Sequence, residues 1–220
     1  MVDLSQLIYV KRNAVSKETC DYLISKKDMY ETRWRKEIAD HALKDKYEEV
    51  GFESVICRPE HTMPFKILHG IFEKYTKEYA DYIDTLGIGH SGYRKYIAFS
   101  HEYRLLKYEQ GSSVIPHIDG VYGVYGSFSI NLNDNYEGGL FSFFNGKHKV
   151  ELGIGDIVIF PVNHFTVHEV EEVTKGTRYS FHTLLHHIPY TFRKEIEEQI
   201  EKKLESHDYK NDPLWYDLSK

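Results

Sequence analysis

The chain has few cysteines and no long apolar run. Only Cys20 and Cys57 occur among its 220 residues, and they form no Cys-x-x-Cys pair. At most one disulfide can therefore form, and reduced thiols in a cytosol are the better interpretation. No window approaches the roughly 18 consecutive apolar residues of a membrane span, and the N-terminus, with an acid at position 3, does not resemble a signal peptide. We therefore expect a soluble cytoplasmic protein without a membrane partner.

The chain also lacks an excess of positive charge. Its 28 Lys and Arg residues stand against 34 Asp and Glu residues, which gives a formal charge of −6. Basic residues cluster only at Arg33, Arg35 and Lys36, so nucleic acid is not expected as an obligate partner. The length suits one domain over residues 1–220, and the sequence shows no internal repeat and no low-complexity linker.

Residues 1–90 have mainly helical patterns. Ser16 is a suitable N-cap for a helix that runs to about Lys26. After Pro64, apolar residues recur every four positions, which predicts a longer helix that ends near Gly87. The charged stretch of residues 35–60 has weak periodicity and is predicted as loop with a short helix. A charged amphipathic helix is expected in the tail, residues 191–220, with a solvated face that at most makes a weak homodimer contact.

In residues 91–190 the apolar period shifts towards two, which indicates short strands. Asn145-Gly146 predicts a two-residue hairpin turn between two of them. Eight or nine strands at this spacing favour a jelly roll, so the fold class is α+β with a mainly β core. The strands are expected at residues 95–99, 103–108, 114–118, 128–132, 140–144, 147–152, 157–160, 167–171 and 178–185.

A His-x-Asp pair occurs once in the chain, at His117 and Asp119, although the chain has 13 histidines. On an extended segment these two side chains point to the same face. A distant strand that brings His168 beside them would complete two imidazoles and one carboxylate. This set holds non-haem ferrous iron and leaves positions open for a chelating cosubstrate and dioxygen.

Arg178 follows His168 by ten residues and starts the last expected strand. Its planar guanidinium suits a carboxylate, so it is a candidate to bind the far end of a chelating cosubstrate. By alternation Arg178, Ser180 and His182 share one face of that strand. Lys175 competes for the same role but is expected in the turn before Gly176.

Residues from about Tyr103 to His186 resemble the prolyl 4-hydroxylase-like branch of the iron(II)- and 2-oxoglutarate-dependent dioxygenases. The resemblance rests on Tyr108 and on the motifs HIDG, SINLN, EGG, GD, FP, HEV and TKGTRYS, in that order. It implies a double-stranded β-helix (cupin-like) with Fe(II) on His117, Asp119 and His168. It also implies 2-oxoglutarate held at its distal carboxylate by Arg178.

The same resemblance suggests further ligands of 2-oxoglutarate. Tyr108 resembles the tyrosine that lines the cosubstrate pocket, and His182 lies on the face of Arg178. Asn131 is a departure, because relatives often place a tyrosine just before the Leu-Asn pair, and here an amide would have to replace its hydroxyl. Leu140-Phe141 is another departure, since relatives tend to follow Gly-Gly with an acidic residue and Thr.

The activity implied is hydroxylation of a peptidyl proline, with O₂ consumed, succinate and CO₂ released, and ascorbate as reductant. The Gly-rich segment directly after Asp119 places Tyr122 and Tyr125 where a proline-containing peptide could be clamped. Two alternatives stay open. One is a cupin-type metal-binding module without catalysis, and the other is an oxygenase of the same mechanism that acts on a small molecule or another residue.

Overall fold

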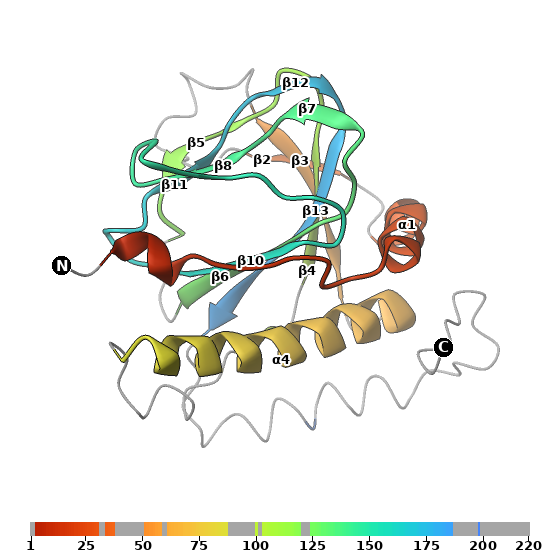
Figure 1. Cartoon of the computed structure of the whole chain (residues 1–220). Coiled ribbons are helices and arrows are strands. Elements are labelled where there is room, and N and C mark those ends of the chain that lie inside the picture. The colour runs from red at the N-terminus through yellow and green to blue at the C-terminus, as the bar shows by residue number, and fades with distance from the viewer. Residues whose placement is uncertain are drawn as a thin grey trace.

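The computed structural model describes residues 3–30, 34–37, 51–58, 61–87, 100, 103–119, 124–186 and 198. Two antiparallel sheets face each other in this part of the chain, and a long helix crosses the outer face of one of them (Figure 1). None of the described helices is long and apolar enough to cross a membrane. The helices are α1 (Lys17–Ser25), α2 (Lys27–Tyr30) and α4 (Thr62–Thr85), and a 3₁₀ turn covers Leu4–Leu7.

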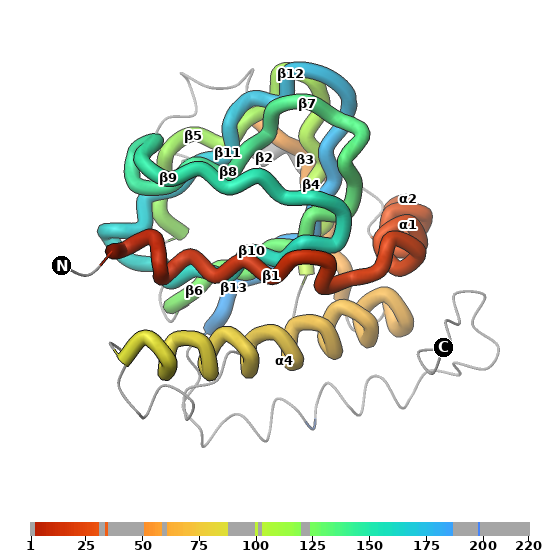
Figure 2. Tube along the Cα trace, viewed as in Figure 1, coloured from red at the N-terminus to blue at the C-terminus, as the bar shows by residue number. Residues whose placement is uncertain are grey.

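The larger sheet has seven strands in the order β1-β10-β6-β13-β4-β3-β2, and the smaller has four in the order β5-β11-β8-β9. Strands β7 and β12 form a separate pair. Neighbours that are distant in sequence, such as β5 and β11, are typical of a jelly roll (Figure 2). The predicted fold class is thus confirmed. The strands are β1 (Tyr9–Lys11), β2 (Arg35–Glu37), β3 (Phe52–Cys57), β4 (Tyr103–Tyr108), β5 (Val114–His117), β6 (Val124–Asn131), β7 (Tyr136–Gly138), β8 (Phe141–Phe143), β9 (His148–Val150), β10 (Ile157–Pro161), β11 (His168–Val170), β12 (Val173–Gly176) and β13 (Arg178–His186).

Two apolar clusters form the core, one on each face of the seven-stranded sheet. Along β10, Ile157 and Ile159 belong to the cluster beneath α4, whereas Val158 and Phe160 belong to the cluster between the two sheets. This strand is buried on both faces, and its unbroken apolar run follows from that position. Polar side chains that face the second cluster are therefore enclosed between the two sheets.

Three tyrosine hydroxyls tie α4 to the N-terminal segment. Tyr75, Tyr79 and Tyr82 donate hydrogen bonds to the backbone oxygens of Ala14, Leu7 and Gln6. Their spacing of four and three residues places them on one side of the helix. The helix therefore holds the segment that pairs as β1 with the edge of the seven-stranded sheet.

The predicted helices are found where the structure describes them. Ser16 caps α1, since its hydroxyl oxygen accepts a hydrogen bond of 3.2 Å from the backbone N–H of Thr19. The helix after Pro64 is α4, which ends two residues before Gly87. The helix expected in residues 191–220 lies outside the described residues, apart from helical Glu198. The division of the chain at residues 90 and 190 stays a prediction.

Most of the predicted strands are confirmed, and three local predictions were wrong. The segment of residues 52–57, predicted as loop, is β3, and residues 35–37 pair with it as β2, because β4 offers a partner along the whole of β3. Lys175 lies on β12 and not in a turn, although its amine is exposed and pairs with Glu137. The connection between β8 and β9 covers residues 144–147, with three positive φ angles, and is not a two-residue turn.

Three further strands, β1, β7 and β12, were not predicted, because three or four residues are too few to establish a period. The strand expected at residues 95–99 lies outside the described residues. Cys20 and Cys57 are both free and buried.

Candidate metal centre

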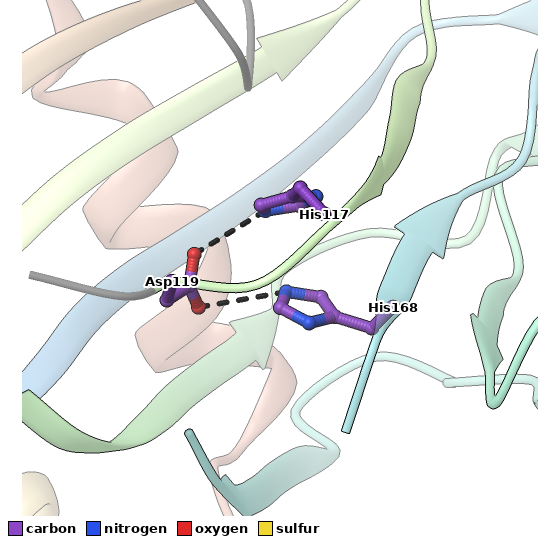
Figure 3. A group of neighbouring side chains, drawn as sticks. All are labelled: His117, Asp119 and His168. Atoms are coloured by element: carbon purple, nitrogen blue, oxygen red, sulfur yellow. Dashed lines mark ion pairs between the residues drawn. The ribbon is translucent and has the colours of Figure 1, made fainter. Parts of the chain in front are cut away.

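The two candidate histidine ligands lie on neighbouring strands. His117 ends β5 and His168 begins β11, and the two residues are register partners in this antiparallel pair. Their ring centroids are 4.3 Å apart. Asp119, two residues after His117, turns its carboxylate towards both rings (Figure 3). One ligand atom from each of the three residues lies within 4.8 Å of the others. The sequence therefore identified a cluster that the fold does assemble.

Backbone carbonyls orient both imidazoles. Nδ1 of His117 lies 2.8 Å from the carbonyl oxygen of Ile115, and Nδ1 of His168 lies 3.2 Å from that of Thr166. Because a carbonyl only accepts, each Nδ1 carries a proton, and Nε2 is the nitrogen of each ring that faces Asp119 and can bind a metal when it is deprotonated. Hydrogen bonds of this kind fix the tautomer of metal-binding histidines. Both Nε2 atoms face Asp119, at 3.2 Å from Oδ1 and 3.5 Å from Oδ2 respectively.

The opposite charges of the cluster shift the pKa values of His117 and Asp119 in opposite directions. Burial alone would lower the pKa of His117, but the hydrogen bond and charge of Asp119 outweigh it and raise that pKa above its ordinary value. Burial would raise the pKa of Asp119, but His117 and His168 hold it well below the ordinary value. Asp119 is therefore a carboxylate at neutral pH, which is the form that binds a cation.

Aromatic rings enclose the His168 side of the cluster. The ring of Phe160 meets the His168 ring edge-on with a centroid distance of 4.6 Å, and Phe143 lies at 6.0 Å. The side chain of His168 is only 5% exposed, against 15% for His117 and 14% for Asp119. The cluster is thus closed on the side of these rings and opens on the side of His117 and Asp119.

Arg178 is buried in the same interior with a cation that has no hydrogen-bond partner. The residue is 1% exposed, and its Nε and both terminal nitrogens lack a partner among the described residues. The rings of Tyr108 and Phe141 lie 5.1 and 5.4 Å from the guanidinium carbon, within the range of cation–π contacts. The departure Leu140-Phe141 thus supplies one wall of the arginine site. The guanidinium edge remains free to bind an anion.

Sequence reasoning missed a role for Ser180, which lies between Arg178 and His182 on the inward face of β13. The residue is 1% exposed, and its hydroxyl has no hydrogen-bond partner in the described part of the chain. Buried hydroxyls without a partner are uncommon, so this one also suits a polar ligand. The signal was present in the sequence, because the alternation that directs Arg178 inward directs Ser180 inward as well.

The remaining candidates have mixed positions. Asn131 is fully buried, but its Nδ2 donates to the backbone oxygens of Asn133 and Leu152, and its Oδ1 accepts from the Tyr136 hydroxyl. Its amide is therefore engaged by protein groups, and its contact with 2-oxoglutarate stays a prediction. Tyr125 lies near the start of β6 and is half-buried, while Tyr122 lies outside the described residues.

His182 lies beside the metal cluster, and its contact with 2-oxoglutarate stays a prediction. Its Nε2 is 3.0 Å from the hydroxyl oxygen of Ser127 and 3.9 Å from Oδ2 of Asp119. Burial lowers the pKa of His182, and nearby Arg104 adds to this effect, although Asp119 opposes it. The ring is therefore neutral at physiological pH.

The donor set fits a divalent metal with a chelating dicarboxylate. Two neutral imidazoles and one carboxylate are the three ligands that hold ferrous iron and leave positions open. Arg178 and the cluster lie on the same interior, with Arg178 four residues before His182 on β13. At a rise of about 3.3 Å per residue, Arg178 and His182 are roughly 13 Å apart along the strand. A small dicarboxylate together with the arginine side chain can span that distance.

Comparisons with known proteins agree with this site. Residues 103–186 match the family model of the 2OG-Fe(II) oxygenase superfamily. A comparison of the sequence with curated proteins gave no match. The three-dimensional structure is similar to a Pseudomonas putida prolyl-4-hydroxylase, with TM-score 0.60 and 16% identity over 82% of this chain and 92% of that chain.

Two further solved structures have the same fold. One is a Trichoplax adhaerens prolyl hydroxylase in complex with a hypoxia inducible factor peptide fragment, with TM-score 0.60 and 14% identity over 93% of this chain and 88% of that chain. The other is a viral collagen prolyl hydroxylase from Paramecium Bursaria Chlorella virus-1, with TM-score 0.56 and 14% identity over 83% of this chain and 96% of that chain.

The matched segment contains the whole metal cluster and Arg178. This segment is therefore similar to the 2OG-Fe(II) oxygenase superfamily. The fold of the chain is that of the prolyl hydroxylase structures described above. For this family Fe(II), 2-oxoglutarate and O₂ are implied, and the His-Asp-His set suits the metal.

Proposed function

We propose that the protein hydroxylates a peptidyl proline, as a prolyl 4-hydroxylase-like enzyme that releases succinate and CO₂. His117, Asp119 and His168 would hold the iron, and Arg178 would bind the distal carboxylate of 2-oxoglutarate. The observation that carries this assignment is the unpaired guanidinium of Arg178 in the same buried interior as the His-Asp-His set. A cupin module that only binds metal has no need of a buried cation at that place.

The protein's own residues provide binding, orientation and exclusion of water. The rings of Tyr108 and Phe141 contact the guanidinium of Arg178 and restrict its rotamers, so that the group is positioned to meet a carboxylate. Phe160 and Phe143 keep water from the His168 side of the cluster. The bound metal and 2-oxoglutarate supply the oxidation of a C–H bond by dioxygen, so no protein side chain has to act as acid or base.

The nature of the substrate is supported by the structural neighbours. All three described above are prolyl hydroxylases by their titles, and one of them holds a peptide fragment. In this chain we propose that a proline-containing peptide or protein lies against the segment that follows Asp119, with Tyr122 as a flat apolar surface. Tyr125 instead packs against the apolar cluster beneath α4. We also propose ascorbate as reductant, a cytoplasmic location, and a monomer or weak homodimer without nucleic acid or membrane.

The test is an assay of succinate release from 2-oxoglutarate with Fe(II) and ascorbate, in the presence of proline-rich peptides. Mass spectrometry then shows whether a peptide gains one oxygen and on which residue. We expect oxygen on proline with the wild-type protein and no turnover with His117→Ala. His164→Ala is the matched control, because His164 is exposed in the turn before His168 and should leave turnover unchanged.

Two results would contradict the proposal in different ways. Absence of metal-dependent succinate release with every peptide would favour the non-catalytic cupin module. Succinate release that is coupled to a small molecule or to a residue other than proline would keep the oxygenase but replace the substrate.

A further inference from the structure

A third histidine lies beside the metal cluster and is not one of its ligands. Nε2 of His182 is 3.9 Å from Oδ2 of Asp119, but it does not join the group of mutually close ligand atoms formed by His117, Asp119 and His168. Its own hydrogen-bond partner is the hydroxyl of Ser127 at 3.0 Å. The ring therefore faces the carboxylate from outside the ligand set.

Asp119 is the least supported of the three ligands. It follows the end of β5 at His117 and has no partner in the sheet, whereas His117 and His168 are both held by strand pairing. Its Oδ2 is buried and has no hydrogen-bond partner among the described residues. Its nearest side-chain nitrogens belong to His117 and His168, and a bound metal would take the lone pairs of both.

Nε2 of His182 is the side-chain nitrogen near Asp119 that a bound metal would leave available. It lies near the middle of β13, a strand paired on both sides, with β4 and β6. Ser127, on β6, is 1% exposed, and its hydroxyl oxygen lies 3.0 Å from the same Nε2 atom. A neutral imidazole carries at most one hydrogen on Nε2, so Ser127 and Asp119 compete for this donor, and rotation of the Asp119 side chain would bring the carboxylate closer to it. Carboxylates that bind metals are themselves commonly hydrogen-bonded by such outer residues.

We propose that His182 is a positioning residue that donates the hydrogen on Nε2 to the metal-binding carboxylate of Asp119 and so raises the affinity of the site for its metal. This inference rests on the metal site of the proposed function. It does not depend on the substrate. It also replaces the expected role of His182 as a ligand of 2-oxoglutarate with one nearer to the metal.

The test measures metal binding alone, as the affinity for Mn(II) determined from the electron paramagnetic resonance signal of the free ion. Loss of an outer hydrogen bond to a metal ligand weakens metal binding by roughly 10- to 100-fold, and we expect this of His182→Leu. His182→Gln keeps an N–H donor and should recover most of the affinity. Ser127→Ala removes a competing partner of Nε2, so it should not weaken binding, and it should have no effect when His182 is already leucine.

Ser129→Ala is the matched control. Ser129 lies two residues from Ser127 on the same strand and is buried, but its hydroxyl donates to the backbone oxygen of Phe181 and not to His182. It should bind Mn(II) with wild-type affinity. A loss of affinity equal to that of His182→Leu would show a general packing effect and overturn the inference.

Unchanged Mn(II) affinity in His182→Leu would also overturn the inference while the proposed function stands. If His182→Leu does not fold, as judged by circular dichroism, His182→Phe, which keeps a flat ring and removes the donor, is measured in its place. A wild-type protein whose Mn(II) binding does not depend on His117 would instead refute the metal site of the proposed function, and this inference with it.

Discussion

Replacement of Arg178 by methionine should stabilise the protein without its cosubstrate and abolish cosubstrate binding. The guanidinium is 1% exposed, and none of its three nitrogens has a hydrogen-bond partner in the described structure. Each buried donor without a partner costs about 1–3 kcal/mol. The contacts with Tyr108 and Phe141 return about 1–2 kcal/mol each when desolvated. A net penalty of a few kcal/mol therefore remains in the wild-type protein.

Methionine has a similar reach and carries no charge, so Arg178→Met should remove that penalty while the two rings keep a packing partner. We expect a gain of about 1–3 kcal/mol in the free energy of unfolding. At about 2–4 °C per kcal/mol for a chain of this size, the melting temperature should rise by roughly 2–12 °C. Loss of two charge-assisted hydrogen bonds, at about 1.5–3 kcal/mol each, should weaken 2-oxoglutarate binding by roughly 10²- to 10⁴-fold.

Two measurements check this prediction. Differential scanning calorimetry of the metal-free protein gives the melting temperature, and titration calorimetry of the Mn(II)-loaded protein gives the affinity for 2-oxoglutarate. Lys175→Met is the control, because this exposed residue pairs with Glu137 at the surface and should alter neither quantity by much. An Arg178→Met protein that melts below the wild type, or that binds 2-oxoglutarate as tightly, would refute the reasoning.

Three further predictions concern single positions. Ser180→Ala should weaken 2-oxoglutarate binding about tenfold in the same titration, the loss of one hydrogen bond of about 1.4 kcal/mol, whereas Ser129→Ala should not. Because the pKa of His117 is raised, a proton competes with the metal up to a higher pH than for an ordinary histidine. Mn(II) affinity should be full above that pKa and fall about tenfold per pH unit below it, with release of a proton on binding that calorimetry in two buffers detects. Gly155→Ala should destabilise the protein by more than about 3 kcal/mol in urea unfolding, since Gly155 has φ +73° and its Cβ would overlap the carbonyl oxygen of Val15.

Local patterns predicted the larger elements well, and the reason is their length. The helix of residues 62–85 repeats its apolar face over many turns, and strands such as β4 and β10 alternate or are continuously apolar. Segments that pair over three residues, such as β1 and β2, have too short a pattern for any period. The segment that became β3 is bounded by charged residues, and its strand character depends on pairing with β4.

The sequence by itself determined which of the candidate side chains share one face of a strand. His117 and Asp119 are two residues apart, so an extended backbone alone directs them to one side, and alternation from Arg178 directs Ser180 and His182 inward as well. Such relations hold within one strand and need no knowledge of the fold.

The tertiary structure alone decided which neighbours each of these side chains contacts. Register brought His168 opposite His117, and the rings of Tyr108 and Phe141 came to enclose Arg178 from two different strands. It also engaged the amide of Asn131 with backbone carbonyls and placed His182 between Ser127 and the metal-binding carboxylate. These contacts join residues that are far apart in the chain. Strand order and register determine such contacts, and no local pattern encodes either of them.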